Sequence, residues 1–104
     1  MKTPNKILVI RLSSIGDILL SYPLIRNLKS KYPECDIDYL IAARYKGILQ
    51  PINPLLNHIY YFEKQNGFSE ILRYRHIIKQ NNYSWIIDLH NKIRSNLISA
   101  FTNS

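Results

Sequence analysis

The sequence predicts an α/β fold, with a parallel β-sheet flanked by helices, and three observations support this. Short apolar runs typical of strands alternate along the chain with stretches of helical periodicity. The resulting order is βαβαβαβα, and right-handed crossovers then place helices on both faces of the sheet. Hydrophobic residues make up 46% of the 104 residues, so the chain can bury a core. We expect one small domain, corresponding to half of a doubly wound fold.

Four segments have the character of strands. Residues 7–10 form a β-branched, apolar run typical of a strand that is buried on both faces of a parallel sheet. Over residues 36–42, apolar side chains recur at every second position, which predicts a second strand. Residues 58–62 and 84–89 read as the third and fourth strands, the last containing three consecutive apolar residues.

The helical segments lie between these strands. Over residues 17–32 large apolar side chains recur every four residues, at Leu20, Leu24, Leu28 and Tyr32. Pro23 lies inside this stretch, so either the helix is kinked there or its regular part begins near Ser21.

Three further helices are expected. The first is a short helix over residues 44–50, followed by a loop containing Pro51 and Pro54. The second runs over residues 69–81, and the third over residues 92–101, with Asn91 as its cap.

The charge of the chain favours an anionic partner. Lys and Arg number 14 against 7 Asp and Glu, a formal net charge of +7. Nucleic acid, an anionic membrane surface and phosphorylated small molecules satisfy this equally. The basic residues are scattered singly, without the basic run of a typical nucleic-acid footprint, so no nucleic-acid partner is predicted.

The single cysteine, Cys35, excludes an internal disulfide and fits a reducing, cytoplasmic compartment. Residues 1–6 are polar, so no signal peptide is visible, and no run approaches the roughly 20 apolar residues of a membrane span.

The turn after the first strand is the first candidate site, because ligands of open parallel sheets collect at the carboxyl ends of the strands. Gly16 permits a tight bend, while Ser13 and Ser14 offer hydroxyl and backbone donors at the start of a helix, a place suited to an anion. The spacing matches neither a dinucleotide fingerprint nor a P-loop.

Asp17 in this turn has two interpretations. An Asp at a helix start commonly caps backbone N–H groups and interacts well with the helix dipole. Alternatively, its carboxylate faces the cleft as a general base for an attacking sugar hydroxyl. The same oxygens cannot easily fill both roles.

The turn after the fourth strand is the second candidate site. It would bring Asp88 and His90 to the same sheet edge as Asp17. Lys92 and Arg94 then follow at a helix start, against the helix dipole, so either an anion compensates them or they extend into solvent. The three histidines have no metal-ligand spacing, and no metal site is predicted.

These same residues carry a family resemblance. The run from Lys6 to Leu20 with its Ser-Ser-Ile-Gly-Asp core, followed by residues 22–28, is similar to the opening of glycosyltransferase family 9, the lipopolysaccharide heptosyltransferases. Residues 37–40 and 83–95 are also similar to that family in order and spacing. The chain departs from the family at His90 and Asn91, where relatives often have Gln-Gly.

The resemblance implies a GT-B architecture of two Rossmann-like domains with chemistry in the cleft between them. Residues 1–104 would be an incomplete N-terminal, acceptor-side domain, with the C-terminal, donor-binding domain absent from the chain. The family transfers heptose from ADP-heptose to the lipopolysaccharide core with inversion, without a catalytic metal or cofactor. A cytoplasmic location with peripheral contact to the inner membrane surface is expected.

The resemblance also implies roles for individual residues. Asp17 matches the Asp of the family motif and is the proposed base. Substrate-binding residues are expected in the same turn, at Ser13, Ser14 and Gly16, and at the edge beside it, at Asp88 and His90. Arg94 would make a bidentate contact with a carboxylate or phosphate of the acceptor, which Lys would not reproduce.

Two other function classes fit parts of the sequence. A self-sufficient small α/β module could bind a phosphorylated ligand or a protein partner, and the coding sequence downstream of Ser104 would discriminate it from a transferase. A nucleic-acid binder is motivated by net charge alone, and its binding would weaken steeply with salt.

Overall fold

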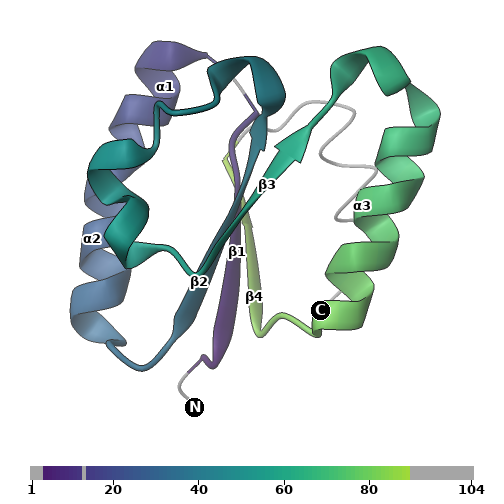
Figure 1. Ribbon diagram of the computed structural model, residues 1–104. Coiled ribbons are helices and arrows are strands. Elements are labelled where there is room, and N and C mark those ends of the chain that lie inside the picture. Colours follow the sequence, from purple (N-terminus) through teal and green to yellow (C-terminus); the bar gives the residue numbers. More distant parts are fainter. Residues whose placement is uncertain (1–3, 13, 90–104) are drawn as a thin grey trace.

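The sheet of the protein consists of four parallel strands. A computed structural model describes residues 4–12 and 14–89. The strands are β1 (Lys6–Ile10), β2 (Asp36–Ala42), β3 (His58–Phe62) and β4 (Trp85–Asp88), in the spatial order β3-β2-β1-β4 (Figure 1). Because the chain adds β2 and β3 on one side of β1 and β4 on the other, the direction of winding reverses between β1 and β4. Ligands of such sheets bind at this reversal, outside the carboxyl ends of the strands.

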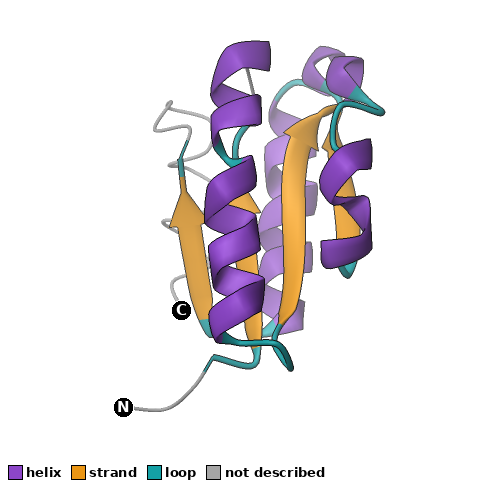
Figure 2. Ribbon diagram, turned by 90° about the vertical axis from the view of Figure 1, so that its left-hand side faces the viewer, coloured by secondary structure: helices purple, strands orange, loops and turns teal. Residues whose placement is uncertain are grey.

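Helices cover both faces of the sheet, which confirms the predicted fold class. Helices α1 (Ile15–Leu20) and α2 (Tyr22–Lys31) follow one another along one face, and α3 (Phe68–Asn81) lies on the other (Figures 1 and 2). Each face has its own core. The α1/α2 side buries Ile7, Val9, Ile18, Ile25, Ile37, Tyr39 and Ile41, and the α3 side buries Leu8, Ile10, Leu40, Phe62, Ile71, Tyr74 and Ile78.

The first helical stretch is divided at Ser21, the second of the two alternatives that Pro23 left open. Pro23 lies in the first turn of α2, where a missing N–H costs nothing. The Ser21 hydroxyl donates to the Ile18 carbonyl (2.6 Å) and pairs with the Tyr39 hydroxyl (2.8 Å), which ties the junction to β2. The predicted stripe is wrong at Leu20, which is 75% exposed, because the break turns Ile18 and Ile25 toward the sheet instead.

The connection between β2 and β3 also differs from the prediction. A helix over residues 44–50 is wrong: the chain forms a short 3-10 segment at Ala43–Tyr45 and a longer one at Gln50–Leu55. The second includes Pro51 and Pro54, which the sequence places in a loop. Its 3-10 geometry bonds residues three apart, as in the Ile52 N–H to Leu49 carbonyl bond of 3.0 Å.

A buried carboxylate lies on the α3 side of β2. Asp38 is 2% exposed because both faces of this strand are covered. Asn57 donates its side-chain amide to Asp38 Oδ1 (3.2 Å), and the Tyr83 hydroxyl donates to Oδ2. Tyr83 lies two residues before β4, so the carboxylate joins three segments at the amino edge of the sheet.

The predicted helix over residues 92–101 lies outside the described residues. Within residues 4–12 and 14–89, no helix has the length and apolar character needed to cross a membrane.

Candidate functional site

Asp17 lies at the reversal of the sheet, in the first turn of α1 just after β1. Its side chain is half exposed. Ser14 is the N-cap residue of α1, but its hydroxyl makes no capping bond to the helix backbone. That hydroxyl donates instead to Asp17 Oδ2 at 3.1 Å.

Arg11 contacts the same carboxylate oxygen. One guanidinium nitrogen of Arg11 lies 2.5 Å from Asp17 Oδ2, and the Arg11 side chain is only 17% exposed. These contacts lower the pKa of Asp17; the hydrogen bond from Arg11 contributes most, followed by that from Ser14. The carboxylate is therefore held ionised. The side-chain hydrogen bonds that Asp17 accepts from described residues all reach its Oδ2.

The end of β4 lies directly beside this turn. Asp88 is paired in register with Ile10, and the Leu89 N–H donates to the Ile10 carbonyl at 2.8 Å. A second nitrogen of the Arg11 guanidinium donates to the Leu89 carbonyl. The structure thus brings Asp88 and Asp17 to the same sheet edge, as the element order predicts. The functional roles of both residues stay predictions.

Gly16 does not make the expected bend. It lies inside α1, and the glycines with positive φ in the described chain are Gly47 and Gly67. A Cβ built on Gly16 would meet no atom within 4 Å, so the position opens onto free space one residue before Asp17. The predicted site residues Ser13, His90 and Arg94 lie outside the described residues.

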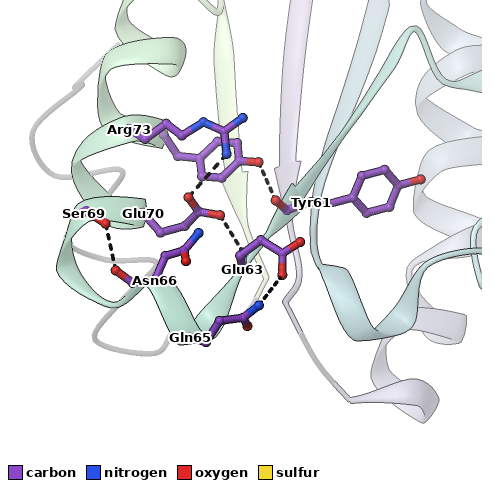
Figure 3. Close-up of polar contacts among 8 residues, drawn as sticks. Tyr61, Glu63, Gln65, Asn66, Ser69, Glu70 and Arg73 are labelled. Atoms are coloured by element: carbon purple, nitrogen blue, oxygen red, sulfur yellow. Dashed lines mark hydrogen bonds and ion pairs between the residues drawn. The ribbon is translucent and has the colours of Figure 1, made fainter.

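A second polar cluster at the carboxyl edge was not predicted (Figure 3). Glu70 in the first turn of α3 is only 2% exposed. Its carboxylate accepts the backbone N–H of Glu63 (2.6 Å), just after β3, and lies 3.3 Å from an Arg73 nitrogen. The Tyr74 hydroxyl donates to the Tyr61 carbonyl. These contacts hold α3 against the end of β3, and the connecting segment Lys64–Asn66 therefore lies along this edge.

Arg11 and Glu70 also lie at the carboxyl edge of the sheet, and neither is predicted there from sequence. A signal existed for Arg11, since a cation directly after a buried apolar strand is placed at the ligand-binding edge. Glu70 carried the ordinary signal of an acidic residue at a helix start. Its burial is a tertiary effect.

The described residues offer no group of three or more His, Cys, Asp or Glu side chains that could hold a metal ion. The chemistry available at the turn after β1 is that of the ionised Asp17 carboxylate, which is half exposed and is held by hydrogen bonds from Arg11 and Ser14.

Known proteins with similar sequences include several lipopolysaccharide heptosyltransferases, although no protein-family model matches the chain. Lipopolysaccharide heptosyltransferase 1 of Campylobacter coli is 30% identical over 95 residues, which cover 90% of this chain and 28% of the relative. Lipopolysaccharide heptosyltransferase 2 of Salmonella typhimurium is 34% identical over 101 residues, 94% of this chain and 29% of the relative. The chain therefore spans under a third of the length of these relatives.

A solved structure has the same fold. The crystal structure of the glycosyl transferase family 9 from Veillonella parvula DSM 2008 superposes on the whole chain with a TM-score of 0.82, at 20% identity, and the match covers 31% of that chain. The sequence and fold comparisons agree with the motif that contains Asp17. Over about nine tenths of its length, the chain is similar in sequence to part of the lipopolysaccharide heptosyltransferases, and it has the fold of the matched part of the glycosyltransferase family 9 structure.

Proposed function

We propose that this chain is the acceptor-side part of a heptosyltransferase that transfers heptose from ADP-heptose to the lipopolysaccharide core, with inversion and without a metal. The observation that carries the proposal is the placement of Asp17. Its carboxylate is ionised, half exposed and located where the winding of the sheet reverses. The relatives named as heptosyltransferases supply the reaction class.

The proposed step requires one base on the acceptor side. The acceptor hydroxyl oxygen bonds to the anomeric carbon of the heptose while the bond from that carbon to the ADP oxygen breaks. ADP leaves with the bonding electrons, and the hydroxyl proton passes to the Asp17 carboxylate. Since Arg11 and Ser14 engage Oδ2, we assign Oδ1 as the oxygen that receives the proton.

The lowered pKa of Asp17 has two consequences for this step. It keeps the carboxylate ionised at neutral pH, so the base is in its reactive form there. It also makes the carboxylate a weaker base. The proton then moves late in the transfer step, because the acceptor hydroxyl becomes acidic only as its oxygen bonds to the anomeric carbon.

The donor side of the reaction would come from the part of the relatives that this chain does not match. We propose that residues 1–104 belong to the acceptor-binding domain of a two-domain enzyme and that ADP-heptose is held by a second domain. We place the protein in the cytoplasm, at the inner face of the membrane, where its net charge of +7 favours contact with anionic lipid.

A fusion enzyme tests this proposal. Residues 1–104 would replace the matching segment of the Salmonella typhimurium heptosyltransferase 2, and heptose transfer to a lipopolysaccharide core acceptor would be followed by mass spectrometry. We expect transfer by the fusion and no ADP release above background by the 104-residue chain alone. A folded fusion that binds ADP-heptose but transfers nothing would refute the proposal, and so would turnover by the chain alone.

A further inference from the structure

Arg11 connects the two turns of the candidate site. We propose that Arg11 is the positioning residue of the transfer reaction, which fixes Asp17 through Oδ2, leaves Oδ1 for the acceptor hydroxyl and ties the base to the end of β4. This inference rests on the proposed function of Asp17 as the base.

The contacts of Arg11 reach three elements. Its backbone N–H donates to the Leu40 carbonyl of β2 at 3.1 Å, which anchors the residue at the end of β1. One guanidinium nitrogen pairs with Asp17 in α1, and another donates to the Leu89 carbonyl after β4. A shift of either turn would therefore be transmitted to the carboxylate through one largely buried side chain.

The planar guanidinium is suited to this task. Its nitrogens point in fixed and different directions, so one side chain can hold a carboxylate and a carbonyl at a set separation. The Lys ammonium is a single, flexible point of charge that would hold one partner at a time. Arg11 is also 17% exposed, so water competes weakly for its hydrogen bonds.

The charged groups around Asp17 define what the loss of Arg11 would do. Among the described residues, Arg11 at the end of β1 is the cation that contacts the carboxylate, and Ser14 adds a neutral donor. Asp88 at the end of β4 lies at the same edge of the sheet. Removing the cation would leave Asp17 with Ser14 as its described donor, which would raise the pKa of Asp17 and free its side chain to rotate.

The 104-residue chain itself tests the contact. The pKa of the Asp17 carboxyl would be measured by carbon-detected NMR in the unsubstituted chain, in Arg11→Gln, in Arg11→Lys and in Arg26→Gln. Arg26 on α2 is exposed and serves as the matched loss of charge. We expect the pKa to rise in Arg11→Gln, to rise less in Arg11→Lys, and to stay unchanged in Arg26→Gln. The Leu89 carbonyl resonance should move in both Arg11 variants.

An unchanged pKa of Asp17 in Arg11→Gln would overturn the inference. If Arg11→Gln does not fold, as judged from its amide spectrum, Arg11→Lys supplies the same comparison, and an Asp17 pKa equal to that of the unsubstituted chain would overturn it likewise.

The fusion enzyme tests the consequence for catalysis. Arg11→Gln is expected to lower kcat by about 10²-fold, the typical effect of a misplaced catalytic group. KM for ADP-heptose should change less than twofold, because in the proposed function the donor is held by the second domain. The acid limb of the pH profile of kcat should move to higher pH. Without Arg11 the pKa of Asp17 is raised, so the carboxylate takes up a proton at a higher pH.

The two proposals fail in different ways. Absence of transfer by the unsubstituted fusion refutes the proposed function, while the NMR titration still tests the hold of Arg11 on Asp17. An active fusion in which Arg11→Gln keeps its kcat and its pH profile refutes the role of Arg11 and leaves the proposed function standing.

Discussion

The Asp17→Asn substitution in the fusion enzyme is expected to lower kcat by about 10²- to 10⁴-fold, the usual contribution of a general base. Asn has the shape of Asp, and it can still accept the hydrogen bonds from Arg11 and Ser14 through its amide oxygen. It cannot take a proton from the acceptor hydroxyl. KM for ADP-heptose should stay nearly constant, and rates of heptose transfer under saturating donor measure the effect.

A matched substitution separates chemistry from stability. Asp36→Asn makes the same change at an exposed Asp that begins β2, at the opposite edge of the sheet. It should leave kcat within twofold of the unsubstituted fusion. Equal loss of activity in both variants, or full activity in Asp17→Asn, would contradict the role of Asp17 as the base.

The largest effect on stability is expected from Tyr83→Phe. This substitution removes the hydroxyl that donates to Asp38 Oδ2 and leaves a buried carboxylate with the Asn57 amide as its remaining described donor. Hydrogen bonds to charged groups contribute about 1.5–3 kcal/mol, so the free energy of unfolding should fall by about 2 kcal/mol. Urea denaturation of the 104-residue chain measures the change.

Tyr32→Phe is the control for this substitution. The Tyr32 ring packs edge-on against Trp85 at 5.5 Å, and no described residue hydrogen-bonds its hydroxyl. Its free energy of unfolding should change by less than about 0.5 kcal/mol. A similar loss in both variants would mean that the contact with Asp38 contributes nothing of its own.

Tyr83 also makes the stability of the chain depend on pH in the alkaline range. Burial, followed by the hydrogen bond with Asp38, raises the pKa of Tyr83, and burial raises the pKa of Tyr39 to about 12. Above the ordinary tyrosine pKa of about 10, the unfolded chain loses these protons while the folded chain keeps them. The folded state then binds more protons, so stability should fall as pH rises from about 10. Tyr83→Phe should reduce this slope, and an unchanged slope in urea titrations between pH 9 and 11 would contradict the assignment.

The strands of this fold could be predicted from sequence because each is a short apolar run on a sheet with two covered faces. The predicted bounds of β2 and β3 match the structure, and β1 and β4 differ by one residue at their ends. The connections were harder. Neither the division at Ser21 nor the 3-10 segment at Gln50–Leu55 follows from periodicity, because prolines fit the first turn of a helix as well as a loop.

The candidate site was predictable in position but not in its contacts. Parallel strand order places Asp17 and Asp88 at one edge without any knowledge of side chains. Which oxygen of Asp17 is occupied depends on Arg11 folding back over the end of its own strand, and that is a tertiary arrangement. The burial of Glu70 is of the same kind, since it depends on how closely α3 packs against the end of β3.

Binding of the acceptor to the 104-residue chain tests the central claim most directly. Titration of the labelled chain with lipopolysaccharide core oligosaccharide should shift NMR signals of Arg11, Ser14, Asp17 and Asp88, which surround the carboxyl ends of β1 and β4. ADP-heptose alone should leave these signals in place. Shifts confined to the amino edge around Asp38, or no shifts at any acceptor concentration, would contradict the assignment of this edge as the acceptor site.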